Sequence, residues 1–458
     1  MTKVCVVGLG YIGLPTAAMF ATKGFEVVGV DVNARIVSAL ERGEVQIQEA
    51  AVRELVREAL ASGRFHAALV PEEADAFVIA VPTPIVKPEV KAEAGAEGRV
   101  GKADLGYVVA AAESIVPYLR PGSLVVLEST SPPRTTEDVL APILERSGIP
   151  TRARSALARA NGKANGHGGE GGRLYVAHCP ERVLPGQIVE ELVGNDRIVG
   201  GLDGESGERA KALYASFVEG EIFVTDATTA EMVKLMENTY RDVNIALANE
   251  LSLVAERVGI DVWEAIRLAN RHPRVSILKP GPGVGGHCIA VDPWFIAEAA
   301  PEVTPLIQTA RRVNDGMPGR VVERVKRALA ERYGESALLA ENRGKYTIAC
   351  LGLAYKADVD DTRESPAVAV VNLLAEEGFV VRAYDPHARP GVVPWQVSSL
   401  SAATDAAQVV VLLTDHAEFR GLGIDALASA DSPVVDTRRV LPSWRATRPI
   451  AEALAALA

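Results

Sequence analysis

The chain has 458 residues, 48% of them hydrophobic, so it can bury large cores and we expect it to divide into two or three domains. Its formal net charge of -11 argues against non-specific nucleic-acid binding. No apolar run reaches the roughly 18 residues that a membrane span needs, and the N-terminus runs into a strand pattern instead of a signal peptide. The four cysteines are scattered without a CxxC pair, so composition predicts a globular protein of the reducing cytoplasm with no nucleic-acid or membrane partner.

The first residues carry a dinucleotide-binding pattern. A short apolar strand at 4–7 is followed by glycines at GxGxxG spacing, Gly8, Gly10 and Gly13, and then by a helical run. A lone GxGxxG is weak, but this one follows a strand, opens a helix and precedes a second strand, 26–31, that ends in an acid. The alternative is a glycine turn without a ligand. In the dinucleotide interpretation the first glycine permits the turn, the second admits the pyrophosphate and the third lets helix and strand pack.

The acid that ends the second strand, Asp31, selects the cofactor. A carboxylate there should hold the ribose hydroxyls and repel a 2′-phosphate, so we predict NAD over NADP, with Arg35 as the residue that keeps NADP open. Further strands at 76–81 and 123–128 end in small or polar residues, and ligands of open α/β sheets bind beyond such ends. The candidate cofactor contacts in the glycine turn and at these strand ends are Gly8, Gly10, Tyr11, Ile12, Gly13, Pro82, Thr83 and Thr130.

Two segments, 87–102 and 152–172, are rich in Gly, Ala and charge and lack apolar periodicity, so we expect mobile surface loops there. Beyond them, a strand-to-loop junction that begins at Tyr175 should place Glu181 at a sheet end. A solvated surface carboxylate is the alternative for this residue.

The texture of the chain changes at Ala227, because neither Gly nor Pro occurs from there until Gly259. Apolar residues recur with a period of 3.6 over this stretch, which predicts one long helix. Lys234 and Asn238 are four residues apart and therefore share a face, beside the apolar stripe. Lys234 can be functional or can simply extend its ammonium group to solvent.

A second helix, 261–269, leads to a loop that contains four glycines and two prolines between Gly281 and Pro293. Such a composition cannot continue a helix or a central strand, so the backbone should form a tight loop that comes close to a ligand. The loop carries Cys288, with His287 beside it and Asp292 four residues later. The thiol can be a nucleophile, a metal ligand or a small buried side chain.

After a helical segment at 304–314, a second α/β pattern begins. Strands at 346–351, 380–385, 409–414 and 434–436 alternate with helical runs, but the first turn lacks GxGxxG. The cations that could bind phosphates here are Lys356, Arg363, Arg438 and Arg439. We therefore predict an α/β fold with two Rossmann-like, doubly wound parallel-sheet domains joined by a long central helix and a helical middle domain. The expected bounds are 1–210, 211–317 and 318–458.

Five motifs in order along the chain resemble the UDP-glucose/GDP-mannose dehydrogenase family. They are Gly8–Pro15, Cys179–Arg182, Lys234–Asn238, Gly285–Asp292 and Asp361–Pro366. The resemblance covers nearly the whole chain, apart from the Gly-rich insertion near 152–172. It implies a cytoplasmic, NAD-dependent enzyme that oxidises the C6 alcohol of a UDP-sugar in two hydride transfers.

The resemblance also implies a role for each catalytic candidate. Cys288 would add to the intermediate aldehyde and give a thiohemiacetal, whose oxidation yields a thioester that water cleaves. Lys234 and Asn238 would stabilise the C6 oxygen. Asp292 would order a water, Glu181 would act as the general base of hydrolysis, and Thr130 would position the water or the cofactor. Which of Lys234, Asp292 and Glu181 takes the alcohol proton stays open.

The same resemblance implies the substrate and the partners. Residues 244–251, 269–275 and 280–295 look most like the branch that oxidises UDP-N-acetyl-D-mannosamine, whereas the UDP-glucose and UDP-N-acetylglucosamine branches usually carry Pro where this chain has Ala290. A homodimer, or a higher oligomer built from it, would form through the long helix, with Arg274 reaching the neighbouring subunit's substrate. The implied substrate contacts are Glu181, Arg182, Val183, Lys234, Asn238, Arg274, Gly285, Lys356 and Arg363.

Three other classes of protein compete with this interpretation. A metalloprotein would use His287, Cys288 and Asp292, but their spacing is poor and we expect no metal. An epimerase or one-step dehydrogenase would need a Tyr/Lys pair or a His base and no thiol. A non-catalytic NAD sensor would not need the Cys, Lys, Asn, Asp and Glu set. The number of NADH formed per sugar distinguishes these classes, because the four-electron enzyme forms two.

Overall fold

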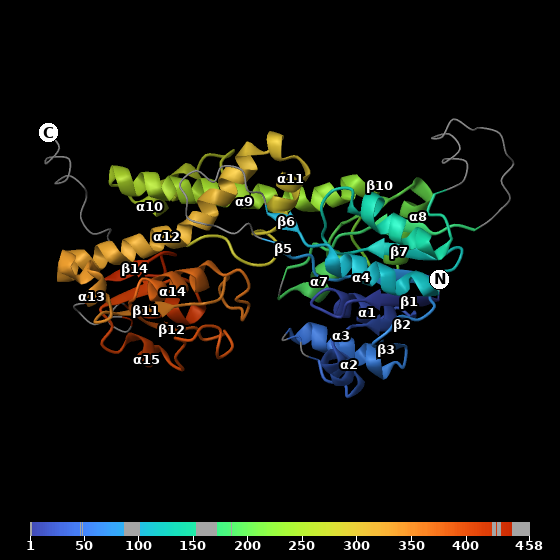
Figure 1. Cartoon of the computed structure of the whole chain (residues 1–458), viewed down its shortest axis with the longest axis horizontal. Coiled ribbons are helices and arrows are strands. Elements are labelled where there is room, and N and C mark those ends of the chain that lie inside the picture. The colour runs from blue at the N-terminus through green and yellow to red at the C-terminus, as the bar shows by residue number, and fades with distance from the viewer. Residues whose placement is uncertain are drawn as a thin grey trace. The chain divides into compact units, whose positions relative to one another are not determined.

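The structure, a computed structural model, describes residues 2–45, 47, 49–86, 101–152, 172–184, 186–423, 427 and 432–441 (Figure 1). Most of the two segments expected to be surface loops, 87–102 and 152–172, lies outside these residues. The chain divides into two compact units, a first unit of Met1–Glu237 with Trp294–Pro301 and a second unit of Asn238–Pro293 with Glu302–Ala458. Among the described residues, no helix is both long enough and apolar enough to cross a membrane.

The first unit is built on an eight-stranded sheet of order β10-β9-β8-β7-β4-β1-β2-β3. Its strands are β1 Lys3–Val7, β2 Glu26–Val30, β3 Phe65–Ala68, β4 Ala76–Ile79, β7 Leu124–Leu127, β8 Tyr175–His178, β9 Arg197–Gly201 and β10 Ile222–Asp226. A separate two-stranded ribbon consists of β5 Ile85–Val86 and β6 Lys102–Ala103. The strand order places β1, which leads into the glycine turn, between β4 and β2 in the body of the sheet.

Helices cover both faces of this sheet. Alternate residues of β1 enter different apolar cores: Val4 and Val6 pack with the first helix, whereas Cys5 and Val7 pack on the opposite face. Both faces of the sheet are therefore buried from water, which explains why the strands are continuous apolar runs instead of alternating patterns. The helices of this unit are α1 Gly13–Thr22, α2 Ala34–Glu41, α3 Ala50–Ala61, α4 Gly106–Ile115, α5 Ala141–Leu144, α7 Ile188–Gly194 and α8 Gly204–Tyr214. Short helical turns occur at Val116–Tyr118, Thr136–Leu140 and Glu145–Ser147.

One strand pair in this sheet departs from the predicted parallel pattern. Strands β8 and β9 pair antiparallel, with Ala177 opposite Gly201 and His178 opposite Gly200. The sequence analysis missed β3, β9 and β10, because their short runs mix polar residues and glycines with apolar ones. The antiparallel pair brings the start of β9 to the same edge as the end of β8.

The long helix predicted from Ala227 is confirmed as α9, Ala227–Val258. The next helix, α10 Val262–Ala269, begins where Asp261 caps it by accepting the backbone N–H of Trp263. Helix α11 spans Asp292–Ala299 and follows the glycine loop directly. Helix α9 carries Lys234 and Asn238, α11 begins with Asp292, and Cys288 lies in the loop before α11.

Helix α12 is longer than predicted, since it runs from Pro305 to Tyr333 instead of ending near Asn314. Gly316, Pro318 and Gly319 suggested a break, yet the helix continues through all three. Pro318 removes one hydrogen bond to the carbonyl of Asn314, and burial of the apolar face between Met317 and Leu329 offsets that loss.

The second unit holds a four-stranded parallel sheet of order β12-β11-β13-β14. Alternate residues of its first strand again enter two cores, Ile348 and Cys350 on one face and Ala349 and Leu351 on the other. The strands are β11 Thr347–Leu351, β12 Val380–Tyr384, β13 Val409–Leu412 and β14 Val434–Asp436. The helices are α13 Ala340–Arg343, α14 Pro366–Glu376, α15 Leu400–Thr404 and α16 Ala417–Arg420, with short turns at Pro301–Val303 and Glu335–Leu338 (Figure 1). The predicted α/β class with a second Rossmann-like sheet is thus confirmed.

Candidate active site

The glycine turn after β1 has room for a ligand at one position and none for side chains at the others. Gly8 has a φ of +98°, and a Cβ there would lie 2.5 Å from the carbonyl oxygen of Ala80. A Cβ on Gly13 would lie 1.8 Å from the carbonyl oxygen of Gly8, so the helix can start only on glycine. Gly10, by contrast, has no atom within 4 Å of a Cβ position. The open side at Gly10, at the N-terminus of α1, fits a pyrophosphate.

Asp31 lies at the end of β2 beside this turn. Its Oδ2 accepts the backbone N–H of Leu9 at 3.0 Å, and its Oδ1 accepts the N–H of Asn33 at 2.8 Å. Each carboxylate oxygen keeps a second lone pair, so Asp31 can also accept ribose hydroxyls. Arg35 is exposed at the start of α2. Tyr11 and Ile12 are half-buried next to the turn.

The ends of β4 and β7 lie side by side at the sheet edge where we expect cofactor contacts. Ser129 joins them, because its hydroxyl donates to the carbonyl of Val81 and accepts the N–H of the same residue. Thr83 presents a buried hydroxyl oxygen that has no hydrogen-bond partner, and Thr130 is half-buried. The sequence analysis missed Ser129, although a serine beside Thr130 at a strand end is a usable signal. The unpartnered hydroxyl of Thr83 and the open side at Gly10 fit a dinucleotide bound at this edge.

Glu181 follows β8 and is only 8% exposed, which excludes a solvated surface carboxylate. Its Oε2 accepts a hydrogen bond from Arg197 at 2.6 Å, and its Oε1 accepts the backbone N–H of Arg182 at 2.7 Å. Val183 is half-buried and packs against the core. The sequence analysis missed Arg197, because its strand was not recognised.

The other polar residues of this edge come from α9. The guanidinium of Arg182 donates two hydrogen bonds to Glu237, at 3.1 and 2.5 Å, which fastens the Glu181 loop to the helix. Lys234 lies one turn earlier and is 9% exposed, so its ammonium group does not extend freely into solvent. In the first unit the structure therefore places Glu181, Arg182 and Lys234 on or against α9.

In the second unit the structure brings together Asn238, Cys288 and Asp292. The amide of Asn238 donates to Asp292 Oδ2 at 2.5 Å, and the backbone N–H of Asp292 donates to the carbonyl of Cys288 at 2.8 Å. Cys288 is half-exposed, whereas Cys5, Cys179 and Cys350 are buried. Of the interpretations left open for Cys288, the small buried side chain is therefore wrong.

The glycines of the Cys288 loop lie against the segment that follows β11. A Cβ on Gly285 would lie 2.6 Å from the Cβ of Tyr355, and one on Gly286 would lie 3.0 Å from the ring of the same tyrosine. The N–H of Gly286 donates to the carbonyl of Arg363 at 3.0 Å. The guanidinium of Arg363 is fixed by the carboxylate of Asp361, and the negative charge of a Cys288 thiolate contributes to raising the pKa of Arg363, after the larger effect of Asp361.

The start of the loop is anchored by a buried polar network between α9 and α12, which the sequence analysis missed. Asn249 Oδ1 accepts the N–H of Gly281 at 2.9 Å, and its Nδ2 donates to Asn314 Oδ1 at 2.9 Å. Asn314 in turn donates to Asp242, which also binds Arg311 at 2.5 Å. All four side chains are at most 1% exposed, so the network fixes both helices and the loop at once.

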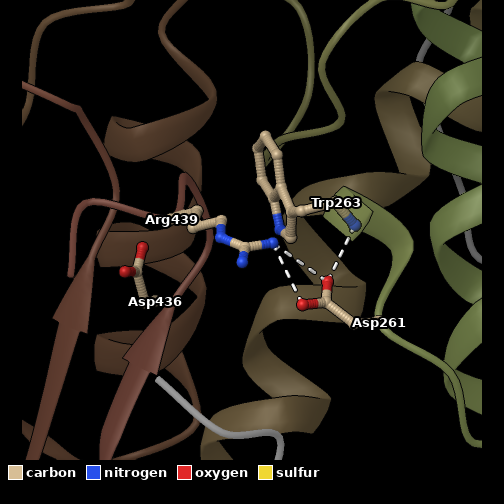
Figure 2. A pocket seen from close by; sticks show the side chains of 4 residues that line it. All are labelled: Asp261, Trp263, Asp436 and Arg439. Carbon is tan, nitrogen blue, oxygen red and sulfur yellow. Dashed lines mark hydrogen bonds and ion pairs between the residues drawn. The ribbon is translucent and has the colours of Figure 1, made fainter. Parts of the chain in front are cut away.

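The cations suggested for phosphates differ in availability. Lys356 and Arg274 are exposed. The side chain of Arg438 lies against Gly281, where a Cβ would be 2.6 Å from its Nη1, and its buried Nε makes no hydrogen bond but lies 3.7 Å from Asp415 Oδ1. Arg439 is already paired with Asp261 at 3.0 Å in a small pocket lined also by Trp263 and Asp436 (Figure 2). Arg438 is therefore better placed than Arg439 to reach a ligand of the loop.

One group of side chains beyond the strand ends of the second sheet has metal-ligand chemistry. Possible ligand atoms of Asp358, His387, His416 and Glu418 all lie within 4.8 Å of one another. His416, however, uses both ring nitrogens for hydrogen bonds, one with Asp385 at 3.0 Å and one from the N–H of Asp358 at 3.0 Å. We assign this group to holding three loops together, as the hydrogen bonds already account for its geometry.

Comparison with known proteins identifies three consecutive family domains. Residues 2–218 match the NAD-binding domain of the UDP-glucose/GDP-mannose dehydrogenase family, 228–316 its central domain and 349–443 its UDP-binding domain. The chain is 46% identical to the UDP-N-acetyl-D-mannosamine dehydrogenase of Methanocaldococcus jannaschii over 96% of this chain and 92% of that protein. It is 47% identical to the NDP-N-acetyl-D-galactosaminuronic acid dehydrogenase of Ralstonia nicotianae over 97% of each.

A solved structure agrees with these matches. The UDP-D-ManNAc dehydrogenase of Pyrococcus horikoshii superimposes with a TM-score of 0.81 at 38% identity, covering 98% of this chain and 97% of that one. The family resemblance drawn from the five motifs is confirmed, and NAD is the cofactor of the family's N-terminal domain. The chain therefore belongs to the UDP-glucose/GDP-mannose dehydrogenase family and is an NAD-dependent nucleotide-sugar dehydrogenase.

Proposed function

We propose that this enzyme oxidises the C6 alcohol of UDP-N-acetyl-D-mannosamine to the uronate through a covalent intermediate on Cys288. The observation that carries the proposal is the half-exposed thiol of Cys288 in a glycine loop, whose backbone carbonyl accepts the N–H of Asp292, the residue that binds Asn238. A four-electron oxidation needs a way to keep the aldehyde from escaping, and a thiol nucleophile provides it. None of the other three cysteines is exposed enough to serve.

Each side chain then has a defined task. NAD, when bound, would supply the hydride acceptor, and each of the two oxidations would consume one NAD. Lys234 and Asn238 hold the C6 oxygen as negative charge develops on it. The Cys288 thiolate adds to the aldehyde carbon to give the thiohemiacetal, and loss of the second hydride leaves the thioester. Water, with Glu181 taking its proton, attacks the thioester carbonyl; the carbon–sulfur bond breaks and the thiolate is released. Asp292 orders the water network, and the proposal leaves open which group takes the first alcohol proton.

We also propose the binding roles predicted from the sequence. NAD would contact Gly8, Gly10, Tyr11, Ile12, Gly13, Asp31, Arg35, Pro82, Thr83 and Thr130. The nucleotide sugar would contact Arg182, Val183, Gly285, Lys356 and Arg363 besides the catalytic residues. The corresponding domains would be 1–210, 211–317 and 318–458, working in the cytoplasm, where a free catalytic thiol stays reduced.

The identity of the sugar is tested by a substrate panel. The two relatives differ in the hexosamine that their names give, mannosamine in one and galactosaminuronic acid in the other. We expect UDP-N-acetylmannosamine to react faster than UDP-N-acetylgalactosamine, UDP-N-acetylglucosamine or UDP-glucose, with two NADH per sugar. Faster turnover of a rival would correct the sugar and leave the chemistry intact. One NADH per sugar would contradict the thioester route itself.

We propose a homodimer through α9. Apolar side chains along this helix are exposed at Met236, Tyr240, Leu247, Val254 and Val258. Three of them, Tyr240, Leu247 and Val254, recur every seven residues, which is the spacing of a helix-pairing seam that a second copy can cover. Arg274, exposed in the single chain, would reach the partner's substrate.

The mass in solution tests the dimer. Light scattering should give twice the chain mass for the wild type, and Tyr240→Glu should lower it, because Tyr240 is 71% exposed in the seam. Tyr107→Glu is the matched control, since Tyr107 is 54% exposed on α4. A monomeric wild type contradicts the proposal.

A further inference from the structure

The proposed general base, Glu181, and two buried neighbours form what we call the buried trio: Glu128, Glu181 and Arg197. Glu128 directly follows β7, Glu181 follows β8, and Arg197 is the first residue of β9. The antiparallel register of β8 and β9 pairs His178 with Gly200, so extending it by three residues sets Glu181 opposite Arg197. The departure from a parallel sheet is thus what brings a cation to the base.

The contacts within the buried trio are unequal. Arg197 Nη2 donates to Glu181 Oε2 at 2.6 Å, whereas its Nη1 lies 3.7 Å from Glu128 Oε1. The exposed fractions are 2% for Glu128, 4% for Arg197 and 8% for Glu181, so water screens none of these charges well. The guanidinium also lies over the ring of Tyr214, 4.8 Å from its centroid. Arg197 is therefore fixed on the Glu181 side.

One guanidinium cannot balance two buried carboxylates, so the trio needs a proton. Burial, and then the charge of Glu181, raise the pKa of Glu128 to about 8, although Arg197 opposes the shift. The hydrogen bonds leave room for a proton on Glu128, because its buried Oε2 has no hydrogen-bond partner. Tyr214 and Thr16 act with Arg197 to lower the pKa, but burial and the charge of Glu181 outweigh them.

Two other groups that face Glu128, the Cys179 thiol and the Tyr214 hydroxyl, do not titrate near neutrality. Burial raises the pKa of the Cys179 thiol to about 12, and burial raises that of Tyr214, whose hydroxyl donates to Glu128 Oε1 at 3.1 Å, well above its usual value. The titratable and polar groups around the carboxyl, from α1, β8, β9 and α8, are Thr16, Cys179, Glu181, Arg197 and Tyr214. Cys179 and Tyr214 therefore keep their protons between neutral pH and pH 9, the range in which Glu128 changes charge.

We propose that Arg197 is the positioning residue that holds Glu181 for thioester hydrolysis, and that an uncharged Glu128 leaves Arg197 committed to that task. The inference rests on the proposed function, in which Glu181 takes the proton of the attacking water. With Glu128 neutral, the guanidinium fixes one oxygen of Glu181 and leaves lone pairs of the carboxylate for that water. When Glu128 ionises, two carboxylates compete for Arg197 and the hold on Glu181 weakens.

The first test changes Arg197. In Arg197→Met both hydride transfers precede the impaired step, so mixing enzyme with NAD and UDP-sugar should give a burst of two NADH per active site and then a steady rate at least tenfold below wild type. Mass spectrometry should find the uronyl group on Cys288, and we expect the same adduct in Glu181→Gln, which loses the base itself. Arg197→Lys keeps a cation and should restore part of the steady rate. kcat/KM for NAD and for the sugar should stay within about twofold, because both hydride transfers precede the impaired step, and KM should fall together with kcat.

The second test changes Glu128 and does not depend on whether an Arg197 variant folds. A group that keeps its proton in the folded state but ionises in the unfolded one weakens folding as pH rises from about 4 to its folded pKa. Glu128→Gln should therefore have a Tm at pH 7 equal to or above wild type. The matched control is Glu231→Gln: burial also raises the pKa of Glu231, to about 7, but both of its oxygens accept backbone N–H groups, from Arg134 and Thr136, so this change should lower Tm.

The pH profile completes the test. The single-turnover rate of thioester hydrolysis should fall above about pH 8 in the wild type, and this alkaline fall should vanish in Glu128→Gln. A folded Arg197→Met enzyme without a burst and with the wild-type rate overturns the inference, as does a Glu128→Gln enzyme with lowered Tm and an unchanged pH profile. If the wild type forms two NADH per sugar in those experiments, the proposed function survives; a wild type that forms none overturns both.

Discussion

Asn249 offers the sharpest test of how the active loop is held. It lies far along α9, yet its side chain binds the first residue of that loop. The change is Asn249→Ala. It deprives the N–H of Gly281 of its acceptor and the Oδ1 of Asn314 of its donor, and both positions are buried. Among the described residues, neither the N–H of Gly281 nor the Oδ1 of Asn314 makes another hydrogen bond.

The magnitude follows from those two atoms. A buried polar group left without a partner costs about 1–3 kcal/mol, so two of them lower the free energy of unfolding by about 2–6 kcal/mol. Catalysis should fall as well, because the Cys288 loop begins at the residue that Asn249 anchors, and a displacement of about 1 Å at a reacting group can cost roughly a hundredfold in rate. KM for NAD should not change, since the dinucleotide turn belongs to the first unit.

Denaturant titration with calorimetry measures the stability, and NADH formation measures kcat. Asn342→Ala is the matched control: Asn342 also makes two side-chain hydrogen bonds in the second unit, but at the surface, where water replaces them. Asn249→Asp keeps the acceptor for Gly281 while losing the donor to Asn314, so it should lose stability but retain more activity than the alanine variant. An Asn249→Ala enzyme with the midpoint and kcat of the wild type would refute the reasoning.

Three further predictions follow from other residues. Cys288→Ser should fold and bind NAD but lose steady formation of two NADH per sugar, because a hydroxyl is a far weaker nucleophile than a thiolate; undiminished turnover by Cys288→Ala would sink the covalent route. Asp31 should make kcat/KM for NAD exceed that for NADP, and equal values would remove its assigned role. Burial acts to raise the pKa of Asp385, but five hydrogen bonds to its carboxylate outweigh burial and lower that pKa. The stability that Asp385 contributes is therefore present above about pH 4 and is lost as pH falls towards the folded pKa. The Tm difference between wild type and Asp385→Asn should accordingly be largest at neutral pH and shrink below pH 4.

The elements that could be predicted from sequence are those whose signal is local. The turn at Gly8 needs a positive φ, the 32-residue helix α9 has an uninterrupted apolar period, and the loop at Cys288 has a composition that no regular element tolerates. Helix α12 was predicted too short because the interactions that stabilise it are not local. Its glycines and proline oppose helix locally, but the buried face on both sides of Pro318 outweighs them, and that burial depends on the sheet behind it.

The site residues divide in the same way. Cys288, Asp292, Lys234 and Asn238 are visible in sequence because loop composition or helical spacing sets them apart. Arg197 has no such signal: it is one arginine at the start of a short strand, and its value comes from a neighbour sixteen residues away that only the β8–β9 register brings opposite. Asn249 resembles any polar residue of a long helix until α12 supplies Asn314 as its partner.

What links these missed residues is that each one satisfies a polar group that the recognised motif leaves buried. A glycine loop exposes backbone N–H groups to close packing, and a buried base needs a counter-charge, so each predicted motif implies an unseen partner. The sequence therefore indicates that such partners must exist without identifying them. The chemistry requires an acceptor for the N–H of Gly281 and a cation for Glu181. The fold determines which side chains are these partners. Only the pairing of α9 with α12 and the antiparallel strand β9 bring Asn249 within hydrogen-bond distance of Gly281, and Arg197 within hydrogen-bond distance of Glu181.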